Sequence, residues 1–273
     1  MGARLSIKFG IIGGGVMGEA LLSRLIAQQI YPAEEILVSD PQLHRRDFLA
    51  QQYGVQVTAD NRAVAAASNV LLLAVKPQVF EAVVADLADD ERAESPPLVI
   101  SIMAGVSLSQ LEAAFSLSGA IRAMPNTPAT VGAGMTALAR GKHATNQHLE
   151  EAKTIFQAVG EVVEVPESLM DAVTGLSGSG PGYVAIMVEA LTDGGVAAGL
   201  PRAIASSLAL QTVLGTAQLL HESGLHPAEL KDRVTSPGGT TIAGIAQLER
   251  SGFRSALIEA VVAASRRSQE LGK

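Results

Sequence analysis

The strongest indication of the fold lies near the N-terminus, in the sequence Ile7-Lys8-Phe9-Gly10-Ile11-Ile12-Gly13-Gly14-Gly15-Val16-Met17-Gly18. An apolar run leads into the glycine spacing G-x-G-x-x-G, and leucines at helical spacing follow. A strand, a glycine turn and a helix in this order form the phosphate-binding start of a dinucleotide-binding unit. We expect Gly13 to permit the tight turn, Gly15 to let the backbone approach a pyrophosphate, and Gly18 to let the helix pack closely on the strand.

The first half of the chain alternates short apolar runs with helical patterns. After Ile7–Ile12, the predicted strands are Glu35–Ser39, Val55–Val57, Val70–Val75, Leu98–Ile102, Ala120–Met124 and Glu161–Val165. Nearly continuous apolar strands that alternate with helices are typical of a parallel sheet covered on both faces. The sequence therefore predicts an α/β Rossmann-type doubly wound parallel sheet. His143 and His148 fall in a polar connecting stretch, where we expect surface residues.

Helical patterns replace this alternation from Ser168 onward. The predicted helices are Gly182–Gly194, Arg202–Ser223, Pro227–Val234, Thr241–Arg250 and Ser255–Leu271. We expect a domain boundary near Val165-Pro166, which gives a dinucleotide-binding domain over residues 1–165 and an all-α C-terminal domain over residues 166–273. The helices are rich in small residues and poor in charges. They suit tight packing either across a subunit interface or within an ordinary intrachain bundle.

Charge and composition argue against several classes of protein. The chain has 20 Lys and Arg against 27 Asp and Glu, a net charge of −7, which should repel nucleic-acid phosphates. It has no cysteine, which removes disulfides, zinc–cysteine sites and thiol catalysis. The uncharged stretch Ala203–Leu220 carries several Ser, Thr and Gln residues, so we expect a packed helix rather than a membrane span. A cytoplasmic protein without nucleic-acid or membrane partners is the resulting expectation.

Further polar residues end the predicted strands. Asp40 follows the glycines by about 20 residues, the position of a carboxylate that binds the ribose 2′-hydroxyl of NADH. The neighbouring run His44-Arg45-Arg46 could instead accept the 2′-phosphate of NADPH, and Asp40 could be only a turn residue, so the choice of cofactor stays open. Lys76 suits either a cofactor contact or a solvated loop. Asn126 lies in a proline-stiffened loop that could aim polar groups into the same crevice or be a plain turn.

A second glycine loop, Ser236-Pro237-Gly238-Gly239-Thr240-Thr241, opens a predicted helix. Consecutive N–H groups at such a helix start can bind a carboxylate, although ordinary N-capping by Ser or Thr is the alternative. The middle of the chain, residues 154–220, has no lysine or histidine to act as a base. Reduction of an imine needs little proton abstraction, so it is a reaction that a site without a lysine or histidine base could catalyse. Glu189 and Asp193 could hold a metal, but helix contacts suit them better, and we expect no metal site.

The run Leu230–Thr241 resembles the signature of pyrroline-5-carboxylate reductases. Three further segments, Ala74–Gln78, Met124–Pro128 and Thr174–Tyr183, match that family in the same order, as does the opening glycine loop. The resemblance covers nearly the whole chain. One departure is Gly182, where the family commonly has Ala; it lowers helix propensity without altering the chemistry.

The resemblance implies reduction of Δ1-pyrroline-5-carboxylate, a cyclic imino acid, to L-proline by NADPH or NADH, the final step of proline biosynthesis. It also implies that the helical domain binds substrate and forms a domain-swapped homodimer, sometimes assembled into a ring of dimers, so that each substrate site draws on both protomers. Together with the motifs, it assigns cofactor binding to Ile12, Gly13, Gly14, Gly15, Val16, Met17, Gly18, Asp40, Asn61, Ala74, Val75, Lys76, Pro77, Met103, Ala104, Gly105 and Asn126. It assigns substrate binding to Ser236, Gly238, Gly239, Thr240 and Thr241, with the Thr241 hydroxyl as the catalytic hydrogen-bond partner of the ring nitrogen.

Two other functions fit parts of the pattern. One is another two-domain NAD(P) reductase of imines or hydroxyacids, although the missing lysine disfavours the hydroxyacid branch. The other is a dinucleotide-binding sensor that has lost turnover, which the intact Ser236–Thr241 loop disfavours.

Overall fold

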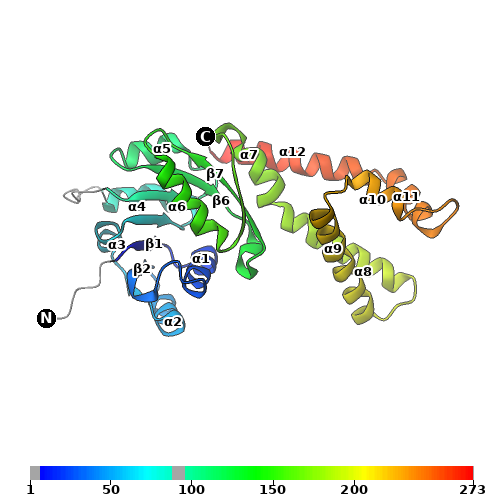
Figure 1. Ribbon diagram of the computed structural model, residues 1–273, viewed down its shortest axis with the longest axis horizontal. Coiled ribbons are helices and arrows are strands. Elements are labelled where there is room, and N and C mark those ends of the chain that lie inside the picture. Colours follow the sequence, from blue (N-terminus) through cyan, green and yellow to red (C-terminus); the bar gives the residue numbers. More distant parts are fainter. Residues whose placement is uncertain (1–6, 88–95, 273) are drawn as a thin grey trace. The chain divides into compact units, whose positions relative to one another are not determined.

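The structure, a computed structural model, describes residues 7–87 and 96–272 and divides the chain into two compact units (Figure 1). The first unit comprises Met1–Gly178 with Ala264–Lys273, and the second comprises Ser179–Ala263. This division differs from the boundary expected at Val165-Pro166. The reason lies in the short helix α7 (Met170–Val173), because Met170 is fully buried in the core of the sheet. Ser268 also donates a 2.6 Å hydrogen bond to Asp171, which joins the C-terminal residues to the same unit.

An eight-stranded sheet in the order β3-β2-β1-β4-β5-β6-β7-β8 forms the first unit. Neighbouring strands are parallel except for β6 and β7, which are antiparallel. The doubly wound, mostly parallel sheet is therefore confirmed, although β7 and β8 run opposite to the strands β1 to β6. The strands are β1 (Phe9–Ile12), β2 (Ile36–Ser39), β3 (Gln56–Thr58), β4 (Val70–Leu73), β5 (Leu98–Ser101), β6 (Ala120–Met124), β7 (Gly134–Arg140) and β8 (Gly160–Glu164).

Helices cover both faces of this sheet (Figure 1). One face packs against α1 (Val16–Ala27), α2 (Leu43–Tyr53) and α6 (Asn146–Gln157), and the other against α3 (Asn61–Ala67), α4 (Phe80–Leu87) and α5 (Leu108–Ala114). Short 3₁₀ turns complete the unit: η1 (Ala33–Glu35), η2 (Pro77–Val79), η3 (Thr127–Val131) and η4 (Glu167–Leu169). The π-helical turn η5 (Thr174–Gly178) follows α7.

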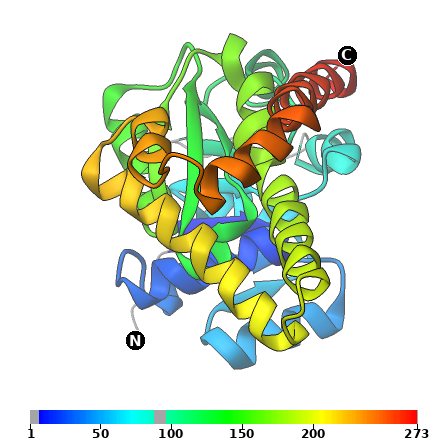
Figure 2. The ribbon, with the colours of Figure 1, turned by 90° about the vertical axis from the view of Figure 1, so that its right-hand side faces the viewer.

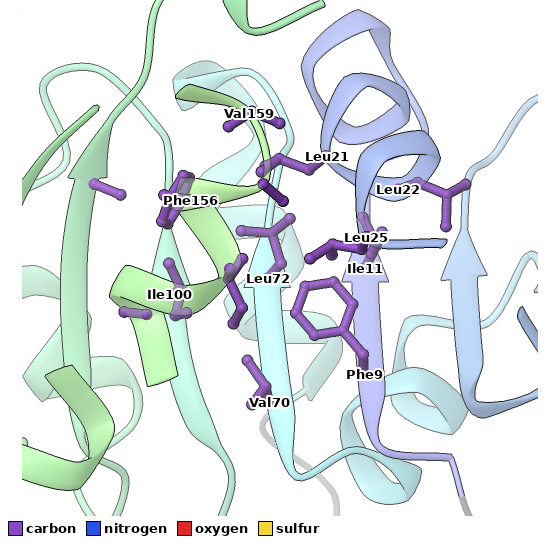
Figure 3. Close-up of a cluster of buried hydrophobic side chains, with 14 of the residues drawn as sticks. Phe9, Ile11, Leu21, Leu22, Leu25, Val70, Leu72, Ile100, Phe156 and Val159 are labelled. Carbon is purple, nitrogen blue, oxygen red and sulfur yellow. The ribbon is translucent and has the colours of Figure 1, made fainter. Parts of the chain in front are cut away.

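The continuous apolar strands supply side chains to both cores. In β4, Val70 and Leu72 belong to the core under α1 and α6, whereas Leu71 and Leu73 belong to the core under α3 to α5. Figure 3 shows the first of these cores, with Phe9 beside Leu72 and α1. Because successive strand residues point to opposite faces, only a strand that is apolar at every position can be buried on both sides. This pattern fixes the sheet in the middle of three layers.

The connecting stretch expected around the two histidines is shorter than predicted, because β7 ends at Arg140 and α6 begins at Asn146. His143 lies in the loop between them, whereas His148 lies in α6. His148 is half-buried and belongs to a capping box at the start of α6, in which its backbone N–H donates to Thr145 Oγ1 at 3.2 Å. His143 is exposed, as expected.

The second unit is helical, and all five predicted helices are present. They are α8 (Gly180–Ala197), α9 (Arg202–Ser223), α10 (Pro227–Arg233), α11 (Thr240–Arg250) and α12 (Phe253–Leu271), the last of which ends within the first unit. Figure 2 shows α8 and α9 as two long helices that meet where residues 198–201 join them. Small residues allow this contact, since a Cβ on Gly195 would stand 3.0 Å from Ala205 Cβ.

Few large side chains of the second unit are buried within one chain. Ile186, Leu208, Leu210 and Leu214 are all more than half exposed. In the described residues, α9 is the single helix long and apolar enough to cross a membrane by length and composition, and only 11% of its apolar window is buried. We expected α9 to be a packed helix, but contacts within its own chain leave most of its apolar surface exposed.

Candidate active site

Three strand ends meet at the point where the strand order of the sheet reverses. Ile12 at the end of β1 lies in register with Ser39 of β2 on one side and Leu73 of β4 on the other. Gly13 N donates to Ser39 O at 2.9 Å, and Ala74 N donates to Ile12 O at 2.8 Å. In open α/β sheets, ligands bind beyond the carboxyl ends of the strands at such a switch point. The fold thus brings the glycine loop, Asp40 and the residues after β4 to one edge.

Each glycine of the loop meets a different steric condition. Gly13 has φ +104°, and a Cβ there would stand 2.8 Å from the Ala74 backbone. A Cβ on Gly18 would stand 2.3 Å from Gly13 O, so helix α1 packs directly on the turn. No heavy atom lies within 4 Å of the Cβ position of Gly15, the N-cap of α1, and no side chain caps this helix. An open cradle with free first-turn amides fits the pyrophosphate of a dinucleotide.

The Asp40 carboxylate faces the glycine loop. Its Oδ2 accepts a hydrogen bond from Gly14 N at 3.1 Å, and its Oδ1 accepts one from Gln42 N at 2.9 Å. Arg46 Nη1 donates to the carbonyl oxygens of Asp40 and Pro41 at 2.7 and 3.0 Å. Asp40 is therefore a turn residue whose carboxylate also holds the glycine loop. Hydrogen bonds from Arg46 fix the backbone of Asp40 and Pro41.

Asn61 starts helix α3 beside the same strand end. Ser39 Oγ donates to Asn61 Oδ1 at 2.7 Å, and Asn61 Nδ2 donates to Asp86 Oδ2 at 3.1 Å. This places Asn61 next to the residue that precedes Asp40. Lys76 is exposed after β4, and the Val75 side chain packs against the second core.

Residues 103–105 follow β5 at the same sheet edge. Met103 is 2% exposed as a whole residue, and its side chain lies in the core under α3 to α5. Gly105 has φ +79°, and a Cβ there would stand 3.4 Å from Leu271 O near the C-terminus. Asn126, after β6, donates from Nδ2 to Ser177 O at 3.1 Å and accepts at Oδ1 from Met135 N at 2.8 Å. Its amide therefore joins β7 to the π-helical turn.

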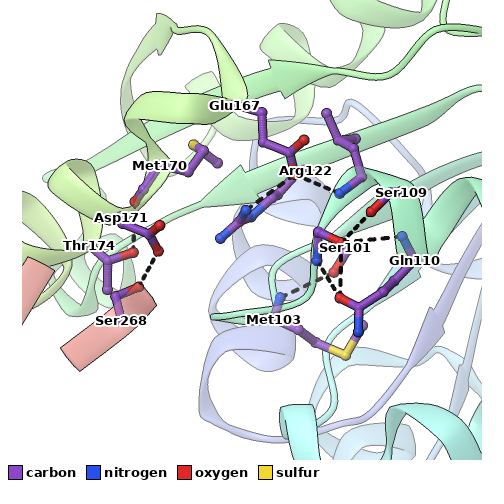
Figure 4. A network of polar contacts seen from close by, with 12 residues as sticks. Ser101, Met103, Ser109, Gln110, Arg122, Glu167, Met170, Asp171, Thr174 and Ser268 are labelled. Atoms are coloured by element: carbon purple, nitrogen blue, oxygen red, sulfur yellow. Dashed lines mark hydrogen bonds and ion pairs between the residues drawn. The ribbon is translucent and has the colours of Figure 1, made fainter. Parts of the chain in front are cut away.

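A polar network under this edge was missed in the sequence. Arg122, in the middle of β6, is almost fully buried and pairs with Glu167 Oε1 at 3.3 Å (Figure 4). The same Glu167 oxygen accepts a hydrogen bond from Leu108 N at 2.6 Å, which joins η4 to the start of α5. The sequence feature that could have revealed the network is Arg122, the single charged residue of an otherwise apolar strand. A second missed group, Glu19 with Arg45 and Tyr53, borders the glycine loop.

The second glycine loop precedes α11 in the helical unit. Gly238 has φ +70°, Gly239 N donates to Ser236 O at 3.0 Å, and Gly239 is the N-cap. No side chain caps α11, so the alternative of Ser or Thr capping does not hold. The side chains of Thr240 and Thr241 are exposed. The helix start therefore presents backbone N–H groups and hydroxyls together, the donor set that a carboxylate needs.

Acidic and imidazole groups are dispersed. Within residues 7–87 and 96–272, no group of three or more His, Asp or Glu residues could hold a metal ion. Asp193, one of the two carboxylates considered for a metal, pairs instead with Arg202 at 2.8 Å.

Comparisons with known proteins match both units. A family model described as pyrroline-5-carboxylate reductase dimerisation matches residues 167–271, and one described as NADP oxidoreductase, coenzyme F420-dependent, matches residues 8–105. A pyrroline-5-carboxylate reductase of Synechocystis is 65% identical over 269 residues, which are 98% of this chain and 100% of that protein.

Solved structures give the same result for the fold. A pyrroline-5-carboxylate reductase from Coxiella burnetii superimposes with a TM-score of 0.90 at 37% identity, over 98% of this chain and 99% of the other. The Plasmodium falciparum pyrroline carboxylate reductase with NADP bound superimposes with a TM-score of 0.86 at 30% identity, over 99% and 100% of the two chains. On the strength of the near-complete Synechocystis alignment, this chain belongs to the pyrroline-5-carboxylate reductase family.

Proposed function

We propose that this protein reduces Δ1-pyrroline-5-carboxylate to L-proline with NADPH or NADH, the last step of proline synthesis. The observation that carries the proposal is that the same chain has two helices, α1 and α11, whose N-termini no side chain caps. One follows the open Gly15 position after β1, and the other follows Gly238-Gly239 before α11. Each offers unpaired N–H groups to an anion, the first to a pyrophosphate and the second to a carboxylate.

The cofactor side of the site is assigned to the edge where β1, β2 and β4 end. The backbone from Ile12 to Gly18 receives the pyrophosphate, and Asp40 with Asn61 borders the adenosine ribose. Ala74–Pro77 and the backbone of Met103–Gly105 line the crevice, and Asn126 orders the loop nearest the nicotinamide through its bond to Ser177 O. When bound, the nicotinamide supplies a hydride to the carbon of the substrate C=N bond.

The substrate side is assigned to residues 236–241. First-turn N–H groups of α11, with Ser236, Gly238, Gly239 and Thr240, bind the substrate carboxylate. The Thr241 hydroxyl, on the same first turn, hydrogen-bonds the ring nitrogen and fixes which face of the ring receives the hydride. A protonated imine nitrogen needs no base to be reduced, which agrees with the absence of lysine and histidine from residues 154–220.

A second copy of the chain completes the helical unit in this proposal. The exposed apolar side chains of α8 and α9 exceed what a monomer usually leaves in water. A homodimer, with or without further assembly into a ring, buries them and lets each substrate site draw on both protomers. We propose a cytoplasmic enzyme in which α9 lies at this interface rather than in a membrane. Light scattering of the purified chain tests the assembly.

Oxidation of the nicotinamide, followed at about 340 nm, tests the reaction. We expect turnover with pyrroline-5-carboxylate and NADPH or NADH, and formation of proline in the products. Hydroxyacid oxidation in the reverse direction without imine reduction would favour the hydroxyacid branch. Tight dinucleotide binding without turnover of any imine would favour the sensor.

A further inference from the structure

A cluster of side chains from α1 and α2 holds the glycine loop from the side away from β4. Arg45 donates from Nε to the Gly14 carbonyl oxygen and from Nη2 to Glu19 Oε2. The Tyr53 hydroxyl donates to Glu19 Oε1 at 2.7 Å. We refer to Glu19, Arg45 and Tyr53 as the α1–α2 cluster.

Packing restricts the Arg45 side chain to this position. Its guanidinium carbon lies 5.1 Å from the centre of the Phe48 ring, and that ring meets Tyr53 edge-on at 6.3 Å. The side chains of Arg45 and Glu19 are only 22% and 25% exposed. A planar guanidinium that contacts a carbonyl, a carboxylate and a ring face at once has little freedom to turn toward another ligand.

The contact with Gly14 fixes the peptide that follows it. Gly14 N donates to Asp40 while Gly14 O accepts from Arg45, so both ends of this residue are tied to the segment between β2 and α2. In a planar trans peptide, the carbonyl of Gly14 and the N–H of Gly15 point in opposite directions. Holding the Gly14 oxygen therefore sets the direction of the Gly15 N–H, at the position where the loop has open space.

The cluster also balances charge at the helix start. Burial raises the pKa of Glu19, but the hydrogen bonds from Arg45 and Tyr53 outweigh it and leave the pKa below its ordinary value. Burial, and then the bond to Glu19, raises the pKa of Tyr53 to about 12, so its hydroxyl remains a donor. An ionised carboxylate in the first turn of α1 repels any phosphate that approaches, unless a cation compensates it. Arg45 is that cation.

We propose that Arg45 is a positioning residue for the dinucleotide, which orients the Gly14–Gly15 peptide and neutralises Glu19, and that it does not bind the ribose 2′ position. The inference rests on the proposed function only in taking a dinucleotide as the ligand of the loop. It revises the sequence-based idea that Arg45 could accept the 2′-phosphate of NADPH. A residue that shapes the pyrophosphate site serves NADPH and NADH equally, whereas a 2′-phosphate ligand serves NADPH alone.

Direct binding of each dinucleotide to the full chain tests the proposal, independently of turnover. For Arg45→Gln, the Kd of NADPH and the Kd of NADH should both rise about 10-fold, the size of one charge-assisted hydrogen bond. The KM for pyrroline-5-carboxylate and the kcat at saturating dinucleotide should stay near wild type. Lys8→Met is the matched control, because it removes an ion pair with Glu35 before β1, away from the loop.

A double variant separates charge from packing. Adding Glu19→Gln to Arg45→Gln removes the uncompensated carboxylate and should recover part of the lost affinity. If Arg45→Gln does not fold, Arg45→Lys keeps the charge without the planar fork and should weaken both cofactors by a smaller factor. Loss confined to NADPH, or unchanged Kd values for both cofactors, would overturn the proposal. Failure of the wild-type chain to bind either dinucleotide would instead overturn the proposed function.

Discussion

Gly18 lies directly against Gly13, so that a Cβ on Gly18 would stand 2.3 Å from the Gly13 carbonyl oxygen. Gly15, between them in the sequence, has no heavy atom within 4 Å of the equivalent position. Two glycines of one motif are thus needed for different reasons. Gly18 serves the packing of α1 on β1, and Gly15 leaves space that the chain itself does not fill.

Replacement of these two glycines should separate stability from binding. Gly15→Val introduces a side chain into open space at φ −69°, which any residue adopts, so the melting temperature should stay near wild type. The added side chain would occupy the space proposed for the pyrophosphate, and NADPH and NADH binding should be lost. Gly18→Ala should instead lower the free energy of unfolding by about 1–3 kcal/mol, as overpacked sites do.

Thermal denaturation and dinucleotide titration of both variants check this pair of outcomes. A Gly15→Val protein with wild-type affinity would remove the loop from the cofactor site. A Gly18→Ala protein of unchanged stability would mean that α1 shifts at no cost.

Thr241→Ala should lower turnover while leaving dinucleotide affinity nearly unchanged. The hydroxyl is exposed at the first turn of α11, in a unit separate from the glycine loop, and its loss removes one oriented donor. Loss of one such donor costs roughly 10- to 1000-fold in kcat, and we expect the lower end because the substrate is iminium-like. Steady-state kinetics with pyrroline-5-carboxylate provide the measurement.

Two comparisons sharpen the test of Thr241. Thr241→Ser keeps the hydroxyl and should restore most of the activity. Thr154→Ala removes an exposed hydroxyl that bonds only within α6 and should leave kcat at the wild-type level. Equal activity of Thr241→Ala and wild type would exclude Thr241 from the mechanism.

Asp40→Ser should shift the preference between cofactors toward NADPH. A carboxylate at the end of β2 repels a 2′-phosphate, and a serine hydroxyl does not. Because Asp40 also accepts a hydrogen bond from Gly14 N, affinity for both cofactors should fall somewhat, so the quantity to compare is the ratio of kcat/KM values for NADPH and NADH. An unchanged ratio would mean that Asp40 serves the turn alone.

The fold could largely be predicted from the sequence because the central strands β1, β4 and β5 are apolar at nearly every position. Strand β4, with Val70–Leu73 buried on both faces, leaves no other arrangement than a covered parallel sheet. The antiparallel strand β7 escaped prediction because Gly134–Arg140 mixes small and polar residues without a clear period. Helix α6 could have been predicted from apolar residues at helical spacing after Thr145, namely Leu149, Ala152 and Ile155. The polar residues between them obscured this pattern.

The candidate site could be predicted only where a motif is local. The glycine loop and the residues around Gly238 are continuous segments whose backbone geometry follows from their own sequence. The contact of Arg45 with Gly14 depends on how α2 packs against α1, which no short window of sequence encodes. The same holds for the bond between Asn126 and Ser177, which joins residues 51 positions apart.

Glu167→Ala should destabilise the first unit more than the removal of a surface carboxylate. Its side chain pairs with Arg122, which is only 8% exposed, and accepts the N–H of Leu108, so its loss leaves a buried cation and a backbone donor without their acceptor. Breaking a fully buried pair costs about 3 kcal/mol or more. Because the Glu167 side chain is 34% exposed and water screens it, we expect a smaller loss of about 1–2 kcal/mol. Glu150→Ala breaks an exposed i,i+3 pair with Lys153 and should cost at most about 0.5 kcal/mol. Urea denaturation of both variants measures the difference, and equal midpoints would show that Arg122 finds water or another acceptor once Glu167 is gone.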